Sequence, residues 1–475
     1  MVRYLLRNSH YIQNYDELTS HGNTEGREIA LDIIEYAMTS IDTYHATRSR
    51  ISLDHHILSV NGYEIDLSQK EHIYILGAGK ASFPIARALE DILGDLISGG
   101  IIIEKREEPL SRVELITGGH PIPDSRSVEG AQKMVELAEK MTESDLALCA
   151  FTGGSSALCT LPAPGLTLQH IQEMTHLLLK SGADIKEINA VRKHLSRVKG
   201  GRLAQIIHPA QIINLTVSDV IGDYDALDVI TCPTVPDTTT CADAVSILQK
   251  YNLWDTVPRA VRTFLESVDP AHETPGYFKD IHVRTIILTT NADICQAAQK
   301  RARSMGCHAV ILSSMIEGES KDAGCVLAGI AREVVNHHHP VPPPAILISG
   351  GETTVTITGV AGKGGPNQEF VLGAALPLAG TYQVVVASLG TDGTDGPTDC
   401  AGGIADGYTL ERAHNKGIDL FNQLVNHNSY EVLTSLEDAI FTGPTGTNVM
   451  DFRLFVILPP GEPRGAQKDS SKDKK

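Results

Sequence analysis

The sequence predicts an α/β protein of two domains, the first a Rossmann-like parallel sheet covered by helices and the second a smaller α/β domain. Three observations carry this prediction. Short aliphatic runs alternate with longer segments whose apolar residues recur at helical spacing, which is the rhythm of βαβ units. This alternation stops near residue 275 and then starts again. The chain has 475 residues and is 42% hydrophobic, so it is long enough for two packed cores.

The first domain is expected to span residues 1–275. It begins with an amphipathic helix over residues 24–49, where Ile29, Ile33 and Ala37 recur at helical spacing. A strand at Ile73 then opens the alternating part. The elements predicted after it are a helix over 81–93, strands over 100–103 and 113–117, a helix over 127–141, a strand over 146–151, helices over 168–181 and 187–195, and a strand over 211–217.

The second domain is expected to span residues 276–458. Its predicted elements are strands over 283–289, 308–313, 345–349, 353–358 and 383–388, and helices over 292–305, 321–336 and 367–378. The polar segment 459–475, which contains proline and glycine, is expected to be a disordered tail.

The net charge limits the kinds of molecule that the protein can bind, and the cysteine pattern indicates the cellular compartment. The formal net charge of −18 argues against nucleic acid or an anionic membrane as a partner, because no excess of cations is available to neutralise phosphates. The eight cysteines occur singly, a pattern typical of thiols in a reducing compartment, and no segment is long and apolar enough for a membrane helix. We therefore expect a cytoplasmic protein that binds small molecules. The sequence leaves the oligomeric state open, with a homodimer as one alternative.

A glycine turn after the first strand of the sheet is the first candidate binding site. Gly77 and Gly79 let the backbone approach an anion, and N–H groups at the start of the next helix, where Ser82 lies, point toward it. We predict that Gly77, Gly79 and Ser82 contact a phosphate, with Lys80 beside it. As a dinucleotide fingerprint the turn lacks its third glycine, although Glu104 would serve as the ribose-binding acid. The spacing excludes a P-loop.

Other strands end in loops that suit phosphate or metal. Gly153, Gly154 and Ser155 follow the strand over 146–151 and offer N–H groups and a hydroxyl to a phosphate. Asp219 and Asp223 follow the strand over 211–217, where they suit a general base and a Mg²⁺ ligand.

Two acidic loops in the second domain complete this set. Glu352 follows the strand over 345–349, and Asp392 and Asp395 follow the strand over 383–388, where they offer the hard oxygens that Mg²⁺ prefers. Ligands of such sheets bind outside the carboxyl ends of the strands, so loops of this kind can converge on one cleft. Turn stabilisation is the alternative role of each loop.

A basic segment over residues 189–202 stands out from the acidic background. Arg192 and Lys199 lie seven residues apart with Ser196 between them, so they share one face if the helix continues that far. Such a face suits a carboxylate or a phosphate. A solvated basic helix is the alternative.

Six longer motifs follow one another along the chain. They are Leu76-Gly77-Ala78-Gly79-Lys80-Ala81, Gly118-Gly119-His120-Pro121-Ile122-Pro123-Asp124, Asn189 with Val191-Arg192-Lys193-His194-Leu195-Ser196, Ser218-Asp219-Val220-Ile221-Gly222-Asp223, Thr391-Asp392-Gly393-Thr394-Asp395-Gly396, and Gly443-Pro444-Thr445-Gly446-Thr447-Asn448-Val449. In this order they resemble the type II glycerate kinases, the glycerate 2-kinases with a C-terminal MOFRL domain. The resemblance covers residues 25–457.

The resemblance implies phosphorylation of D-glycerate at its 2-hydroxyl by ATP and Mg²⁺, giving 2-phosphoglycerate, in a cleft between two α/β domains. It also implies that Lys80 is important for catalysis. In the mechanism that we expect, Lys80 neutralises the transferring phosphoryl group and Asp219 accepts the proton of the hydroxyl. Asp223 or Asp392 holds Mg²⁺.

The same assignment places further residues at the substrate. Arg192 or Lys193 holds the carboxylate of the substrate, and Asn367 and Glu352 are expected to contact the substrate as well. Many relatives carry an arginine, thought to matter for phosphoryl transfer, where this chain has Pro366. Lys193 is therefore also a candidate for the missing catalytic charge, as is Lys363.

Two other departures accompany Pro366: Ile230-Thr231-Cys232-Pro233-Thr234 is one residue shorter than usual and lacks the family glycine, and Ser155 stands where a third glycine is common. These departures resemble a branch often labelled hydroxypyruvate reductase, which keeps a second hypothesis open. An NAD(P)H-dependent reductase would use the glycine turn for pyrophosphate and Glu104 for ribose, with His120 or His194 as proton donor. A third hypothesis is a catalytically silent relative that binds nucleotide.

Overall fold

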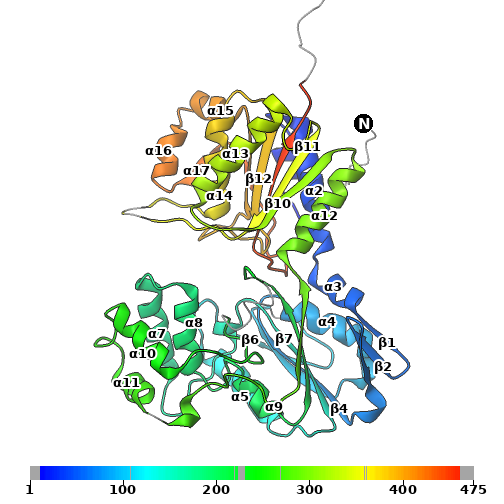
Figure 1. Cartoon of the computed structure of the whole chain (residues 1–475), viewed down its shortest axis with the longest axis vertical. Coiled ribbons are helices and arrows are strands. Elements are labelled where there is room, and N and C mark those ends of the chain that lie inside the picture. Colours follow the sequence, from blue (N-terminus) through cyan, green and yellow to red (C-terminus); the bar gives the residue numbers. More distant parts are fainter. Residues whose placement is uncertain are drawn as a thin grey trace, which may run out of the picture. The chain divides into compact units, whose positions relative to one another are not determined.

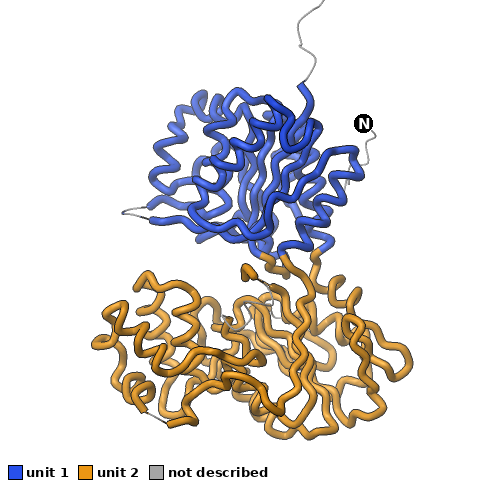
Figure 2. Tube along the Cα trace, in the orientation of Figure 1, with its two compact units in different colours: residues 1–40, 291–445, 450–475 blue, residues 41–290, 446–449 orange. Residues whose placement is uncertain are grey.

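The chain folds into two compact units, each assembled from segments that are distant in sequence (Figures 1 and 2). The computed structural model describes residues 11–106, 108–218, 220–222, 230–267, 269–357, 359 and 361–460. Unit 1 comprises residues 1–40, 291–445 and 450–475, and unit 2 comprises residues 41–290 and 446–449. The division differs from the predicted one, because the first 40 residues group with the C-terminal half and the main boundary follows Thr290.

Unit 2 contains a six-stranded parallel sheet in the order β6-β5-β4-β7-β8-β9. Numbered within this sheet, the order is 3-2-1-4-5-6, which is the Rossmann order. The strands are β4 (His72–Ala78), β5 (Gly99–Glu104), β6 (Glu114–Thr117), β7 (Asp145–Phe151), β8 (Gln211–Val217) and β9 (Val283–Thr289). The predicted Rossmann-like sheet is therefore confirmed. The strand order reverses between β4 and β7, where ligands bind in such sheets.

Successive side chains of the sheet in unit 2 point to opposite faces, and each face packs in its own apolar core. Ile75 on β4 joins one layer with α4 (Ser82–Leu93), and its neighbour Leu76 joins the other with α5 (Ser125–Ala138) and α9 (Arg202–Ile207). Both faces of the sheet are thus covered, as a parallel sheet requires.

The remaining elements of unit 2 form two smaller groups. One is a three-stranded antiparallel sheet that the sequence analysis missed, built from β1 (Ile51–Asp54), β2 (Ile57–Val60) and β3 (Tyr63–Asp66). The other is a helical cluster with its own apolar core, built from α7 (Leu168–Lys180), α8 (Ile185–His194), α10 (Cys241–Lys250) and α11 (Arg259–Glu266). The short helix α6 (Ser155–Leu158) follows β7 directly.

The strand over 283–289 belongs to unit 2, although the predicted boundary placed it in the second domain. It forms β9, which pairs in parallel with β8 through Leu215 and Ile286, among other residues. An apolar run identifies a strand but does not identify its neighbour, so its position in the sheet was not visible in the sequence.

Unit 1 contains a six-stranded mixed sheet in the order β10-β11-β15-β12-β13-β14, which confirms the second α/β domain. β10 (His308–Ile316) and β11 (Ala345–Gly351) are parallel, and the other neighbours are antiparallel. The other strands are β12 (Val384–Gly390), β13 (Gly402–Asp406), β14 (Ala439–Ile440) and β15 (Asp451–Ile457). Of the predicted strand over 353–358, the described residues 353–357 form only a single bridge, between Glu319 and Thr354.

Helices cover the sheet of unit 1. α13 (Ser320–His337) and α14 (Pro366–Leu378) share an apolar core with β11, β12 and β15, while α2 (Thr24–Ser40) packs on α12 (Asn291–Ser304) and contacts β12 and β15 (Figure 1). The short helices α15 (Thr409–Asn415), α16 (Leu420–Val425) and α17 (Ser429–Ser435) follow β13, and α1 (Tyr15–Leu18) precedes α2. No helix within the described part of the chain is both long and apolar enough to cross a membrane.

The predicted helix over 24–49 is two helices, and the break between them coincides with the change of unit. α2 ends at Ser40, and α3 (Thr43–Arg50) begins after Asp42, whose carboxylate accepts the N–H of His45 as an N-cap.

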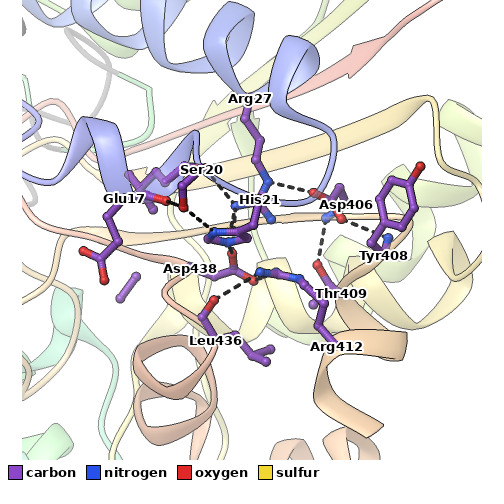
Figure 3. Close-up of polar contacts among 12 residues, drawn as sticks. Glu17, Ser20, His21, Arg27, Asp406, Tyr408, Thr409, Arg412, Leu436 and Asp438 are labelled. Atoms are coloured by element: carbon purple, nitrogen blue, oxygen red, sulfur yellow. Dashed lines mark hydrogen bonds and ion pairs between the residues drawn. The ribbon is translucent and has the colours of Figure 1, made fainter. Parts of the chain in front are cut away.

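Arg27 on α2 fixes the N-terminal segment to the sheet of unit 1 through buried ion pairs (Figure 3). Its Nε lies 2.7 Å from Asp406 Oδ2, and its Nη1 lies 2.8 Å from Asp438 Oδ1, with all three side chains fully buried. His21 and Arg412 also contact Asp438. Both carboxylates thus pair with a cation that lies 379 and 411 residues earlier in the chain.

Candidate active site

The predicted glycine turn holds two strands together and does not present free N–H groups to a phosphate. The N–H of Gly79 donates to Ile103 O and that of Lys80 to Gly153 O, while the N–H of Ser82 turns back to Gly79 O. The N–H of Ala81 donates to the Thr152 hydroxyl at 3.1 Å. The predicted backbone contact between this turn and a phosphate is therefore corrected, because these N–H groups already have protein partners.

The glycines of this turn are required by close packing. A Cβ on Gly77 would lie 2.5 Å from the carbonyl oxygen of Ala150, and a Cβ on Gly79 would lie 2.3 Å from the Thr152 hydroxyl oxygen. Gly79 also has a φ of +128°, which disfavours any other residue. The turn thus packs the end of β4 closely against the end of β7, where the strand order reverses.

The second glycine loop, after β7, keeps its backbone donors available. Within the described residues, the N–H groups of Gly153, Gly154 and Ser156 make no hydrogen bond, and neither do the hydroxyls of Ser155 and Ser156. Gly154 has a φ of +89°. Unbonded donors of this kind suit an anion, and the phosphate contact of this loop stays a prediction.

Lys80 and His120 approach this loop from two other strand ends. A Cβ on Gly154 would lie 3.5 Å from Lys80 Cγ and 3.3 Å from His120 Nε2. Lys80 follows β4, and His120 follows β6. The carboxyl ends of β4, β6 and β7 therefore contribute to one place.

A pocket of about 240 Å³ in unit 2 opens beside the second glycine loop. Its polar lining includes Gly154 and Ser156 from that loop and three residues of the basic segment, Arg192, Ser196 and Lys199. Another part of the lining is an apolar wall formed largely by α7 through Ile171, Met174, Leu178 and Leu179, with Thr175 among them. The helix α8 ends at His194, so the predicted continuous helix face does not exist, yet the three residues still meet in one pocket.

Arg192 and Lys199 place positive charge in this pocket. Within the described residues, no carboxylate pairs with Arg192, and burial lowers the pKa of its guanidinium. Lys199 Nζ donates to Cys159 O at 2.8 Å, and burial, with a smaller effect of Arg192, lowers the Lys199 pKa to about 8. Two neighbouring cations without a carboxylate partner indicate a site for an anion.

Lys193, although adjacent to Arg192, does not line this pocket. Its Nζ lies 2.5 Å from Asp237 Oδ1, and both side chains are buried. Asp237 also accepts hydrogen bonds from Thr239 and Thr274. The predicted catalytic or substrate role of Lys193 is corrected, because its charge is already neutralised inside the protein.

The predicted substrate residue Asn367 is enclosed in unit 1. Its Nδ2 donates to Asp395 Oδ1 and Asp451 Oδ1, and its Oδ1 accepts the hydroxyl of Ser388 at 2.5 Å. Burial raises the pKa of Asp395 to about 6. All polar groups of the Asn367 side chain have protein partners, so the predicted substrate contact is corrected to a structural one.

Pro366, which stands in place of the family arginine, is the first residue of α14. At that position a helix makes no use of a backbone N–H, so proline is tolerated. Asp395 accepts the N–H groups of the next two residues, Asn367 and Gln368, and so caps the helix from outside.

The remaining predicted site residues are divided between the units. Glu352 is exposed after β11, and Asp392 is half-buried after β12, where its Oδ1 accepts the N–H and hydroxyl of Thr394. This Asx turn is the structural alternative considered for the loop. Asp219 and Asp223 lie outside the described residues.

The acid that a dinucleotide would need is not available in unit 2. Glu104 is buried at the end of β5, and its Oε2 accepts the N–H of Arg106 and lies 3.6 Å from the Arg106 guanidinium. With the first glycine turn also bonded internally, the geometry does not favour a dinucleotide.

The apolar wall is the part of the pocket that the predicted site residues do not include, and Lys199 was predicted only as a partner of Arg192 on a basic helix face. The wall was visible only as an amphipathic helix over 168–181, a pattern that usually marks core packing. Lys199 carried a clearer signal, since it sits between Val198 and Gly200 within the basic segment.

The fold and the pocket first define a class, an α/β protein of Rossmann strand order with a pocket lined by the cations Arg192 and Lys199. Residues 29–266 match a domain of unknown function, DUF4147, and residues 345–451 match the MOFRL family. The chain is 40% identical over 435 residues to a protein named glycerate 2-kinase from Pyrococcus horikoshii, covering 91% of this chain and 97% of the relative.

Two further relatives fit the same family. The crystal structure of glycerate kinase from Thermotoga maritima superposes with a TM-score of 0.78 at 36% identity, covering 91% of this chain and 99% of that one. A protein named "Putative hydroxypyruvate reductase" from Agrobacterium vitis is 38% identical, covering 81% of this chain and 98% of the relative. The chain belongs to the glycerate 2-kinase family.

Proposed function

We propose that this protein transfers the γ-phosphoryl group of ATP to the 2-hydroxyl of D-glycerate, giving 2-phosphoglycerate and ADP. One observation carries the proposal beyond the family relationship. The pocket of unit 2 holds two sets of anion-binding groups side by side, the cations Arg192 and Lys199 and the unbonded donors of Gly154 and Ser156. A kinase acting on a hydroxy acid needs both, one set for the carboxylate and one for phosphate.

The cationic set suits the carboxylate of glycerate. A guanidinium without a protein partner binds a carboxylate through two parallel hydrogen bonds, which fixes the orientation of the acid. Lys199 adds a second charge, and the Ser196 hydroxyl adds a polar contact within the same lining. The substrate hydroxyl is thereby held toward the glycine loop, where the phosphoryl group would lie.

The glycine loop and Lys80 suit the transferring group. Phosphoryl transfer depends on positioning and on charge stabilisation, which fixed N–H groups and an ammonium supply. In the step itself a bond forms between the 2-oxygen of glycerate and the γ-phosphorus while the bond to the β–γ bridging oxygen breaks. The hydroxyl proton passes to a base, for which we retain Asp219 from its position after β8.

We take ATP to react as its Mg²⁺ complex. The carboxylate of Asp392 provides the hard oxygens that Mg²⁺ prefers, so its chemistry fits a magnesium ligand, and Asp223 remains the alternative proposed from sequence. Bound Mg²⁺ would neutralise phosphate charge. We also retain a cytoplasmic location, supported by eight cysteines that are all free thiols.

The test is a kinase assay on purified protein with D-glycerate and MgATP. We expect ADP formation that requires D-glycerate and a product identified as the 2-phosphate by phosphorus NMR. Lys80→Ala should lower kcat about 100- to 1000-fold, because it removes one charge-stabilising group. Lys133→Ala, which removes a surface lysine paired with Glu114, is the matched control and should leave kcat unchanged.

A parallel assay with hydroxypyruvate and NADH or NADPH tests the second candidate. Oxidation of the reduced nucleotide without any glycerate-dependent ADP formation would overturn the kinase proposal. Silence in both assays would instead support a relative that only binds nucleotide.

A further inference from the structure

Three side chains outside the pocket converge on one point in unit 2. They are His194 at the end of α8, Cys241 at the start of α10 and Glu273 just after the short 3-10 helix Pro270–His272. Their potential ligand atoms all lie within 4.8 Å of one another. The proposed phosphoryl transfer assigns no role to this cluster.

The tautomer of His194 is fixed by the backbone. Its Nδ1 lies 2.8 Å from the carbonyl oxygen of Ala190, so Nδ1 carries the hydrogen and donates it. A neutral ring then presents the lone pair of Nε2, which lies 3.3 Å from Glu273 Oε2. Two acceptors at this distance repel each other unless a proton or a cation lies between them. A metal-binding histidine is typically oriented by such a second hydrogen bond.

Cys241 adds a thiol to the same point. Its side chain is buried, and burial, followed by the charge of Glu273, raises the pKa of the thiol to about 12. The thiol donates to the carbonyl oxygen of His272 at 3.5 Å, and both burial and the Glu273 carboxylate favour its protonated form. A divalent cation would reverse the effect by favouring the thiolate.

Two other charged groups, Asp237 and Arg202, lie near the cluster. Asp237 lies 4.0 Å from His194 Nδ1 but is paired with Lys193. Arg202 donates to the backbone carbonyl oxygens of Ala271 and His272, which directs its guanidinium to the backbone of the same turn. His194 Nε2 also lies 3.4 Å from the Thr274 hydroxyl, which donates to Asp237, and the Glu273 carboxylate accepts the N–H of Cys241. Neither of these contacts places a proton between Nε2 and the carboxylate.

We propose that His194 Nε2, Cys241 Sγ and the Glu273 carboxylate bind a zinc ion. A nitrogen, a sulfur and an oxygen ligand together suit Zn²⁺, whereas Mg²⁺ selects oxygen alone. Ligands about 2.1 Å from a tetrahedral centre lie about 3.4 Å apart, close to the spacing of Nε2 and Oε2. The Glu273 side chain is 43% exposed, which gives the ion a route from solvent and leaves a fourth position for water.

The ion would link three segments of unit 2 that are distant in sequence. His194 lies two residues after Arg192, so zinc would stiffen the end of the helix that carries the proposed carboxylate-binding residue. The zinc site does not depend on the reaction at the pocket, and its test requires no substrate.

The experiment titrates metal-free full-length protein with Co²⁺ and then with Zn²⁺. We expect one equivalent of Co²⁺ to produce thiolate charge-transfer absorption in the near ultraviolet, and Zn²⁺ to abolish it. Cys241→Ser should remove the absorption, and Glu273→Gln should weaken Zn²⁺ binding by about 100-fold. Cys325→Ser is the control, since Cys325 is the exposed cysteine and would account for adventitious binding.

The outcomes distinguish a zinc site from a direct contact between His194 and Glu273 without a metal. Absence of the absorption in the folded wild-type protein would refute the proposal and leave a direct contact between His194 and Glu273. Equal loss of binding in Cys325→Ser would refute it as well. Circular dichroism of each variant checks that it is folded. Because Glu273 is partly exposed, Glu273→Gln should not disturb the packed core.

Discussion

Arg192 and Lys193 are consecutive cations for which the structure predicts opposite consequences of mutation. Arg192 lines the pocket without a carboxylate partner among the described residues, whereas Lys193 is buried in an ion pair with Asp237. Replacing each by methionine keeps the aliphatic length and removes the charge. Arg192→Met should impair substrate binding, and Lys193→Met should impair folding.

The magnitudes follow from what each charge contacts. A guanidinium holding a carboxylate contributes about 2–3 kcal/mol through charged hydrogen bonds, which corresponds to a loss of about 30- to 150-fold in kcat/KM for glycerate. Removing Lys193 leaves the buried Asp237 unpaired, a change that typically costs about 3–5 kcal/mol. Asp237 keeps its hydrogen bonds from Thr239 and Thr274, so we expect the lower end of that range.

The assay combines steady-state kinetics at varied D-glycerate with urea unfolding of both variants. Arg192→Met should raise KM for glycerate, leave KM for ATP nearly unchanged and unfold at the wild-type urea concentration. Lys193→Met should unfold at lower urea, while its folded fraction keeps the wild-type KM. A Lys193→Met protein of normal stability with a raised KM would refute the reasoning, as would an Arg192→Met protein that is merely unstable.

Three further predictions concern packing and charge. Arg27→Met should destabilise unit 1 by about 3–5 kcal/mol, measured by urea unfolding, because it leaves the buried Asp406 without its cation, while Asp438 keeps its contacts with Arg412 and His21. Gly79→Ala should lower the melting temperature far more than Gly94→Ala, since both have positive φ but only the first places a Cβ against Thr152. The KM for D-glycerate should rise as pH increases from 7 to 9, because the Lys199 ammonium, with its pKa lowered to about 8, loses its proton over that range. Lys199→Arg should remove this pH dependence, and an unchanged profile would contradict the role of Lys199.

The sequence predicts most of the helices and strands correctly, but it does not predict which strands and helices pack against one another. Apolar runs such as Ile101–Ile103 and Val384–Val386 identify strands, because a buried parallel or central strand needs aliphatic residues on both faces. The same runs do not specify which strand lies alongside. For that reason β9 was placed in the wrong domain and α2 was separated from the sheet that it covers.

The site shows the same limit at the level of single residues. The glycine turn at Gly79 has the residue types of an anion site, but its N–H groups are taken by partners such as Gly153, more than 70 residues later. Lys193 and Arg192 are equivalent by type, and only Asp237, 44 residues from Lys193, distinguishes them. Residue type and spacing therefore predict which segment carries the charged side chains. Only the tertiary contacts determine which of these side chains can bind a ligand.

The pairing of Arg27 with Asp406 and Asp438 affects the order in which the units can fold during synthesis, and it affects the choice of fragments for expression. A ribosome releases α2 long before β13 and β14 exist, so unit 1 can close only after nearly the whole chain has been synthesised, whereas the long segment 41–290 of unit 2 emerges earlier as one piece. An expression fragment that begins at residue 276 would include both aspartates and omit their arginine. Fragments meant to isolate the C-terminal half should therefore carry residues 11–40, supplied in the same chain or as a separate peptide.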